Sequence, residues 1–222
     1  MKHNEQEIHA LKEEINEMWK LVISQLEKVK QSFMKNDKET AFEVIQTENK
    51  VNAFELKVDN SCENHIALYN PVAIDLRLVL SIMKISMTLE RIGDYANGVA
   101  RHIHEGDCVR LNSMVVEQLE IERMFDALLS MMTDSFVAFN SESSSNTGKI
   151  VSKDKVVNEI YHQSIRQLTT YLSEHPADAN CVLMMAILLR NMERIGDHCK
   201  NIVEEIVFYL EAKVLKHKGK TE

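Results

Sequence analysis

Apolar residues recur every three or four positions over most of the chain, the spacing of helices that bury one face. The first stripe consists of Ile8, Leu11, Ile15, Met18, Val22, Leu26, Val29 and Phe33. The same spacing continues through about residues 38–69, 71–105, 113–139, 149–172 and 176–213. The pattern therefore predicts an all-α protein built from six long helices.

Polar residues and prolines predict where several of these helices begin. Asn36-Asp37-Lys38-Glu39 resembles a capping box, with Asn36 as the N-cap and Glu39 at N3. Asn70-Pro71 suits the N-cap and first position of the third helix, and Pro176 is expected to open the sixth. The Ser/Asn-rich stretch 141–148 is expected to be a loop, and the most mobile internal segment.

The chain contains an internal repeat. Glu90-Arg91-Ile92-Gly93-Asp94 occurs again as residues 193–197, an offset of 103 residues (193 − 90). The segment 48–52 is similar to 154–158 at an offset of 106 residues (154 − 48), which places a three-residue insertion or deletion near the second turn, and both third helices follow a proline. The repeat predicts two tandem three-helix bundles, one spanning residues 1–106 and the other residues 107–222.

Composition narrows the class of protein. The formal net charge of −8 argues against nucleic-acid binding, because no basic cluster is large enough to neutralise phosphates. No apolar run reaches the ~18 residues of a membrane span, and the acidic amphipathic start does not read as a signal peptide. The cysteines lack regular spacing, which predicts reduced, mostly buried thiols in a cytoplasmic protein; they are Cys62, Cys108, Cys181 and Cys199.

The repeated motif places two carboxylates on one helical face. Glu90 and Asp94 are four residues apart, and their like charges cost a few tenths of a kcal/mol in an exposed helix. The mid-helix Gly93 costs about 1 kcal/mol more relative to alanine. Such a disadvantage, present twice, indicates a function. A glycine allows a neighbouring backbone or a bound group to come close, and paired carboxylates suit a hard cation.

The helical turns predict which residues meet this acidic face. Residues equidistant from the turn of an antiparallel helix pair lie level with each other, and segments 48–52 and 90–94 are equidistant from Pro71. Segments 154–158 and 193–197 are nearly equidistant from Pro176. Each unit is thus predicted to bring four oxygen-bearing side chains together as a metal site. The candidates are Glu48, Asn52, Glu90 and Asp94 in the first unit, and Asp154, Asn158, Glu193 and Asp197 in the second.

A purely structural use of the motif remains open, because Arg91 and Arg194 are placed to form ion pairs with the same carboxylates. Glu55 and Asp59 form a further acidic pair, but the second unit has no acid at either matching position. We interpret that pair as a solvated face. His198 follows Asp197 and is turned about 100° away around the helix, so we do not expect it to be a ligand.

At these residues the chain resembles the PhoU family of bacterial phosphate-uptake regulators. The resemblance covers essentially the whole chain, and its matching stretches are residues 71–77, 89–96 and 193–202. It implies two similar three-helix bundles that hold iron or zinc clusters on paired acidic motifs, one cluster per bundle. The eight candidates above would then be the ligands.

Two departures from the family pattern affect this expectation. The family often has an acid where this chain has Asn52 and Asn158, and an amide brings an oxygen without a charge, so metal affinity should fall or fewer ions should bind. Asn201 fits the family pattern, whereas Gly98 occupies the matching place in the first unit. We therefore expect the two sites to differ.

In function, the resemblance implies a cytoplasmic, non-catalytic adaptor that negatively regulates phosphate uptake and phosphate-response signalling. Its partners would be the ATPase of the phosphate ABC transporter and the phosphate-sensor histidine kinase. It would lie at the membrane only through these partners, and a homodimer is compatible with the sequence.

Two other functions remain as alternatives. A ferritin-like di-metal oxidoreductase needs Glu-x-x-His from two helices facing a bundle core, and only Glu159 and His162 have that spacing. The usual hydrolase and phosphate-loop motifs are also missing, which favours a protein that is not an enzyme. The second alternative is a metal-free helical scaffold in which the repeated motifs form only ion pairs.

Overall fold

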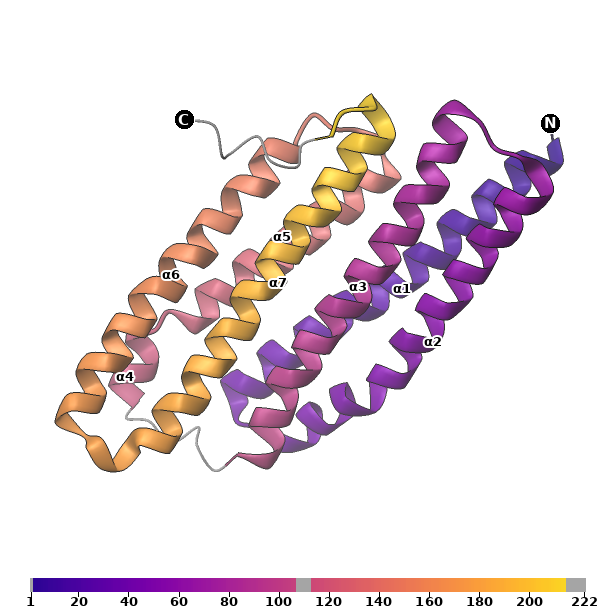
Figure 1. Cartoon of the computed structure of the whole chain (residues 1–222). Coiled ribbons are helices and arrows are strands. Elements are labelled where there is room, and N and C mark those ends of the chain that lie inside the picture. Colours follow the sequence, from indigo (N-terminus) through magenta and orange to yellow (C-terminus); the bar gives the residue numbers. More distant parts are fainter. Residues whose placement is uncertain (1, 107–112, 215–222) are drawn as a thin grey trace.

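The computed structural model describes residues 2–106 and 113–214, and in these ranges it contains helices and turns but no strand (Figure 1). The first unit consists of α1 (Lys2–Lys35), α2 (Lys38–Tyr69) and α3 (Ala73–Glu105). The second consists of α4 (Ser113–Gln118), α5 (Ile121–Asn140), α6 (Thr147–Glu174), the short 3-10 helix η1 (Pro176–Asp178) and α7 (Ala179–Glu211). The all-α prediction is therefore confirmed. The predicted unit boundary after residue 106, and Cys108, adjoin or lie in the part of the chain that is not described.

The capping prediction for α2 was wrong by one residue. Asp37 is the N-cap, and its Oδ1 accepts hydrogen bonds from the backbone N–H groups of Glu39 at 3.0 Å and Thr40 at 3.1 Å. Asn36 instead adopts the left-handed conformation, with φ of 51°. Asparagine tolerates this conformation better than most residues, so it makes the turn while the carboxylate caps the helix.

The predicted start of the third helix was also wrong. Asn70 is the left-handed C-cap of α2, with φ of 46°, and its N–H donates to the carbonyl of Ile66. The third helix begins at Ala73, with Val72 as its N-cap. The turn therefore uses Asn70 and Pro71 to end one helix rather than to start the next, and asparagine is a common residue at a left-handed helix end.

Two elements of the second unit are shorter than predicted. The expected fourth helix is divided into α4 and α5 at Glu120, whose φ is 49°. The freed carbonyl of the buried Leu119 accepts a hydrogen bond from the Ser164 hydroxyl at 3.1 Å, which offsets part of the cost of the break. Pro176 opens η1, and α7 follows it.

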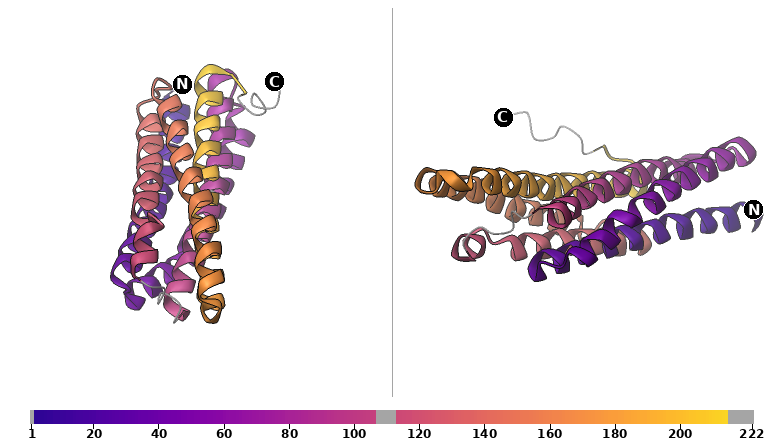
Figure 2. Two further views of the ribbon diagram at one scale, coloured as in Figure 1. Left: turned by 90° about the vertical axis from the view of Figure 1, so that its left-hand side faces the viewer. Right: turned by 90° about the horizontal axis from the view of Figure 1, so that it is seen from below.

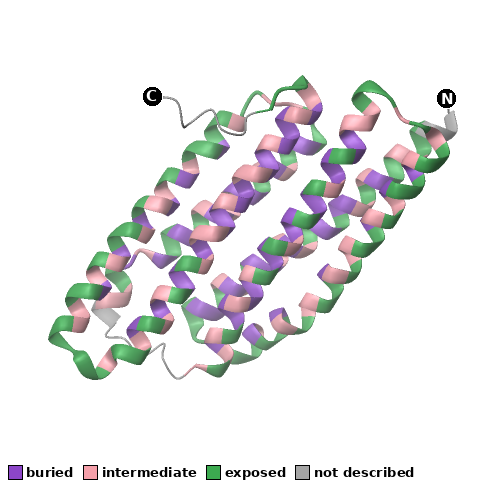
Figure 3. Cartoon of the chain, in the orientation of Figure 1, coloured by how far each residue is buried: buried purple, intermediate pink, exposed green. Residues whose placement is uncertain are grey.

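The helices run along one long axis, and the two units lie side by side (Figure 2). Within the first unit α1, α2 and α3 contact one another, and within the second α5, α6 and α7 do so. Between the units α3 packs along α7, and α1 packs against α5. Figure 3 shows that the buried residues lie where helices face each other, while the outer faces are exposed.

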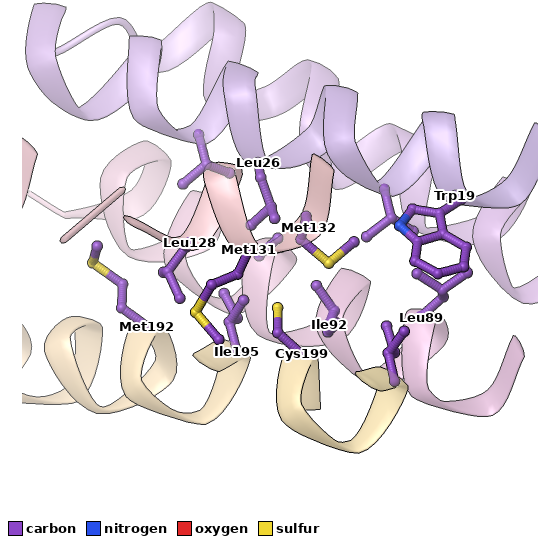
Figure 4. Packing of buried hydrophobic residues seen from close by; sticks show 14 of the residues in the cluster. Trp19, Leu26, Leu89, Ile92, Leu128, Met131, Met132, Met192, Ile195 and Cys199 are labelled. Carbon is purple, nitrogen blue, oxygen red and sulfur yellow. The ribbon is translucent and has the colours of Figure 1, made fainter. Parts of the chain in front are cut away.

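Both units share one hydrophobic core. Ile15, Met18 and Val22 of α1 are fully buried at helical spacing, as the apolar stripe predicts. The same cluster includes Leu26 and Ile92 from the first unit and Met131 and Ile195 from the second, and Figure 4 shows their side chains together. The two repeats are thus structural halves of a single packed body.

The pairing of α3 with α7 is antiparallel. The Arg77 guanidinium donates to the carbonyl of Tyr209 at 3.2 Å, and farther along α3 Gly98 lies against Asn191. A Cβ atom on Gly98 would stand 3.0 Å from the Asn191 amide nitrogen, so the glycine permits the close approach of the two helices. This pairing brings the middle of each repeat to the interface between the units.

Two further sequence expectations concern surfaces and thiols. In the described part of the chain, no helix combines the length and apolar character needed to span a membrane. Cys62 and Cys199 are buried thiols, whereas Cys181 is partly buried. Burial raises the pKa of the Cys62 thiol to about 12 and also raises that of Cys199, which favours the protonated thiol of both residues at neutral pH.

Candidate functional site

The four candidate ligands of the first unit, Glu48, Asn52, Glu90 and Asp94, are called the first quartet here, and those of the second unit the second quartet. The first quartet lies where the middle of α2 faces the middle of α3. The two helices are antiparallel, since Val51 lies beside Gly93 and the Lys38 carbonyl lies 3.0 Å from the ring nitrogen of His104. Glu48 and Asn52 on α2 thereby stand level with Glu90 and Asp94 on α3. The structure thus places these four residues along one stretch of the interface between α2 and α3.

Gly93 explains how closely the helices pack there. A Cβ atom at this position would stand 3.2 Å from Oε1 of Gln25 in α1 and 3.3 Å from a methyl carbon of Val51 in α2. Real Cβ atoms rarely show such short contacts, so the glycine fits the close approach of both neighbouring helices. Its role is to let packed side chains come near, in the middle of the acidic motif.

The carboxylates of the first quartet repel each other in a partly dehydrated setting. Burial raises the pKa of Glu90 to about 7, and the charges of Asp94 and Glu55 add to the rise. Desolvation and the charge of Glu48 raise the pKa of Asp94 as well. Hydrogen bonding between the two carboxyls adds to the rise in the pKa of Glu90 and opposes the rise in that of Asp94, as expected when two acids share one proton.

Glu55 belongs to the same acidic group, although the sequence analysis placed it on a solvated face. Burial, then Asp59, then Asp94 raise the pKa of its carboxyl. Glu48, Asn52 and Glu55 follow the i, i+4, i+7 spacing of one helical face. That spacing could have revealed Glu55, but the absence of an acid at the matching position of the second unit argued against it.

Basic groups neutralise the first quartet only in part. Arg101 forms an ion pair with Glu48, with a nitrogen–oxygen distance of 3.3 Å. No described basic side chain forms an ion pair with Glu90, Asp94 or the neighbouring Glu55, and Arg91 acts on Glu90 only from a distance. The side-chain oxygen of Asn52 is buried and lacks a hydrogen-bond partner among the described residues. The negative charge of the first quartet is therefore only partly compensated by basic side chains.

The second quartet has the same geometry but a different chemistry. Asp154 on α6 faces Asp197 on α7, and the ammonium of Lys200 bridges them, 2.8 Å from an oxygen of each. Asn158 donates its amide to the same Asp154 oxygen at 2.8 Å. The other Asp154 oxygen would stand 2.9 Å from a Cβ atom at Gly196, so this glycine makes room for the carboxylate itself.

Arginines neutralise the remaining acids of this quartet. Arg194 pairs with Asp197 at 3.2 Å, and Arg190 pairs with Glu193 at 2.9 Å. Burial and Asp197 raise the pKa of Glu193, whereas Arg190 opposes that rise. The structural use of the motif that the sequence left open, ion pairing by the motif arginine, is thus present in the second unit.

The repeat register shows which substitutions separate the two quartets. Lys200 corresponds to Asn97 in the first unit, and Arg190 corresponds to Met87. Tyr161, over which the Arg190 guanidinium lies at 5.8 Å, corresponds to Glu55. The first quartet is consequently acidic and the second is neutralised, in line with the expectation that they differ.

In the described structure, neither quartet forms a preorganised metal site. Among the residues that the structure describes, no three His, Cys, Asp or Glu side chains stand together as ready metal ligands. The Glu159–His162 pair of the ferritin-like alternative is exposed on α6, in an open groove of about 510 Å³ that Lys155 and Arg166 also line. The pair faces away from the core that such an enzyme requires.

Comparison with known proteins gives consistent matches over both repeats. The model of the PhoU domain family matches residues 15–103 and again residues 121–206. A phosphate-specific transport system accessory protein PhoU homolog of Aquifex aeolicus is 33% identical over 212 residues, covering 95% of this chain and 94% of that protein. The accessory protein PhoU of Escherichia coli is 32% identical over 216 residues, covering 97% and 88%.

Solved structures agree with these matches. The phosphate transport system regulatory protein PhoU from Streptococcus pneumoniae superposes with a TM-score of 0.86 at 26% identity, covering 96% of this chain and 99% of that one. PhoU from Pseudomonas aeruginosa gives a TM-score of 0.85 at 28% identity, covering 94% and 99%. The fold and the order of the helices are therefore shared over nearly the whole length.

Proposed function

The chain belongs to the PhoU domain family, and from this premise we propose that it is an accessory regulator of a phosphate-specific transport system. The observation that carries the proposal is the match over both repeats, together with relatives of nearly the same length that are named accessory or regulatory proteins of that system. The proposed role is regulatory rather than catalytic. It agrees with the exposed position of Glu159 and His162, the pair that the enzyme alternative would require.

We propose further that the chain acts as an adaptor that binds other proteins in the cytoplasm. It would bind the ATPase of the phosphate transporter and the sensor kinase of the phosphate response, and through them restrain phosphate uptake. The net charge of −8 and the long exposed helical faces suit protein partners better than nucleic acid.

A cellular experiment tests this role. Cells that lack this chain should express phosphate-starvation genes even in high phosphate, and should recover control when the chain is supplied. Affinity purification of the tagged chain from membranes should recover the transporter ATPase and the kinase. Normal repression without the chain, or purification of neither partner in high and low phosphate, would contradict the adaptor role.

Iron or zinc would bind at the first quartet, held by Glu48, Asn52, Glu90 and Asp94, with Glu55 as a further oxygen donor. Three features support this assignment: carboxylates with raised pKa values, the unpartnered oxygen of Asn52, and the scarcity of ion pairs. A bound cation would supply the positive charge that the site lacks.

At this site the carboxylates would bind either protons or metal. With a pKa raised to about 7, the Glu90 carboxyl of the metal-free protein is partly protonated at neutral pH, and its protonated form is stabilised by a hydrogen bond to Asp94. Metal would compete with that proton, because ligating carboxylates must be ionised. Ligands on both α2 and α3 would join the two helices, so metal loading would stiffen the α2–α3 pair of the first unit.

A further inference from the structure

Lys200 occupies the place in the second quartet that a cation would take between two carboxylates. Its ammonium nitrogen lies 2.8 Å from Asp154 and 2.8 Å from Asp197, which belong to different helices. The nitrogen thus links α6 to α7 through one shared positive charge. A bridging metal ion would link the two carboxylates in the same way, but here a side chain of the protein provides the positive charge.

The buried state of Asp154 explains why a fixed cation is needed. This residue is only 4% exposed, and one of its oxygens has no hydrogen-bond partner in the described structure. A carboxylate this deeply buried is costly unless a positive charge compensates it. Lys200 supplies that charge, and the amide of Asn158 supplies one hydrogen bond more.

A metal ion would find little electrostatic attraction at this place. The second quartet contains three acids, and each of them already pairs with a basic side chain, namely Lys200, Arg190 or Arg194. A divalent ion would have to displace the ammonium or remain close to it. In either case the Coulomb attraction that favours a cation is largely cancelled.

The first quartet has no lysine at the position equivalent to Lys200. Asn97 stands at the position of Lys200, carries no charge, and is 4% exposed with an unpartnered side-chain oxygen. Arg101 is the one described basic residue that pairs with an acid there. The two quartets thus keep the same backbone arrangement and differ in whether a cation is already built in.

We propose that the Lys200 ammonium is a built-in counter-ion that replaces metal in the second repeat, so that each chain binds metal only at its first quartet. The one-cluster-per-bundle expectation does not fit the residues of the second quartet. The proposal rests in part on the function proposed above, because it assumes that the first quartet binds metal. Lys200 and Asn97 are then the residues that set which half of the molecule responds to metal.

Reciprocal substitutions test the proposal with the full-length protein. After removal of bound metal, Zn²⁺ binding is measured by calorimetry and by elemental analysis. Wild-type protein should show one class of sites, which Glu90→Gln with Asp94→Asn removes and Glu193→Gln with Asp197→Asn leaves unchanged. Lys200→Asn should gain a second class, whereas Asn97→Lys should lose at least about tenfold in affinity at the first, because a lysine brings its charge to the ligands.

The controls keep loss of folding apart from loss of binding. Circular dichroism establishes that each variant is helical, and Zn²⁺ should raise the melting temperature of Lys200→Asn more than that of wild type. If Lys200→Asn does not fold, Lys200→Met keeps most of the side-chain volume and makes the same test. The variant Glu193→Gln with Asp197→Asn needs no change at Lys200 and provides an independent answer.

Each outcome has a separate meaning. Loss of Zn²⁺ from wild type on changing Glu193 and Asp197 would overturn the inference, and so would a folded Lys200 variant that gains no site. Zn²⁺ binding by Lys200→Asn but not by wild type would support the role of Lys200 and remove the metal site proposed for the first quartet. Absence of binding by both would overturn both proposals.

Discussion

The ring of Tyr95 stacks on the ring of His198, with centroids 5.5 Å apart and planes inclined by 27°. These residues occupy the same position of the two repeats, so an approximate two-fold axis relates α3 to α7 between them. His198 is buried in this contact, and burial lowers the pKa of its imidazole. It packs between the units, against Tyr95 of α3.

This stacked pair should stabilise the contact between the two halves. Tyr95→Leu removes the aromatic contact and should lower the free energy of unfolding by about 1 kcal/mol, a typical value for an aromatic pair beyond its buried area. Tyr95→Phe keeps the ring and should behave nearly as wild type. Urea unfolding followed by circular dichroism measures both, and equal losses in the two variants would show that the hydroxyl matters more than the stack.

The acidic group of the first quartet should make the metal-free protein less stable as pH rises. The folded-state pKa of Glu90, about 7, lies above the ordinary value of about 4.3, so its stabilising effect is complete below pH ~4 and is lost as pH rises through 7. Asp94 and Glu55 shift in the same direction, while Arg91 opposes the shift of Glu90.

Glu90→Gln should therefore flatten the dependence of stability on pH between 5 and 8. At pH 8 the variant should gain on the order of 1 kcal/mol in free energy of unfolding. This is well below the free energy equivalent to the whole pKa shift, because solvent screens a partly exposed group. Chemical unfolding at several pH values, without metal, makes the comparison. An unchanged slope in the variant would mean that Glu90 titrates normally in the folded protein.

Gly196 should tolerate alanine poorly. The added Cβ atom would stand 2.9 Å from a buried oxygen of Asp154, and we expect a net loss of about 1–3 kcal/mol despite the better helix propensity of alanine. Gly148, at the start of α6, is the matched control because no atom lies within 4 Å of its added Cβ. Gly148→Ala should be neutral or slightly stabilising. Similar melting temperatures for the two variants would contradict the packing seen at Gly196.

Glu55 should contribute to metal affinity at the first quartet. Glu55→Gln removes one carboxylate and should weaken Zn²⁺ binding about tenfold, equivalent to about 1.4 kcal/mol. Glu63→Gln, an exposed acid two turns farther along α2, is the control and should bind Zn²⁺ as wild type does. If both variants lose affinity equally, the effect is one of net charge rather than of ligation.

Much of the fold could be predicted from the sequence because helix formation here follows a local pattern. The buried stripe of Ile15, Met18 and Val22 is visible as spacing alone. The break at Glu120 was missed because neither glycine nor proline marks it, and it depends on the Ser164 hydroxyl from another helix. The shared core was also missed, since an apolar face does not show which neighbour will cover it.

The candidate quartets were located by distance from the turns, which a rigid helix pair preserves. The built-in cation was not foreseen, although Lys200 stands three residues after Asp197 in the sequence. Its effect depends on the side chain crossing to Asp154 on α6, a contact between helices that spacing along one helix cannot give. Glu55 was underestimated for the related reason that its partners lie on α3.

The most direct test of the central claim is the position of bound metal in a crystal of the full chain soaked in Zn²⁺ or Fe²⁺. Anomalous scattering at the metal edge should give density between α2 and α3, beside Glu90 and Asp94, and none beside Lys200. Density between α6 and α7, or no density at the first quartet in metal-loaded crystals, would contradict the account.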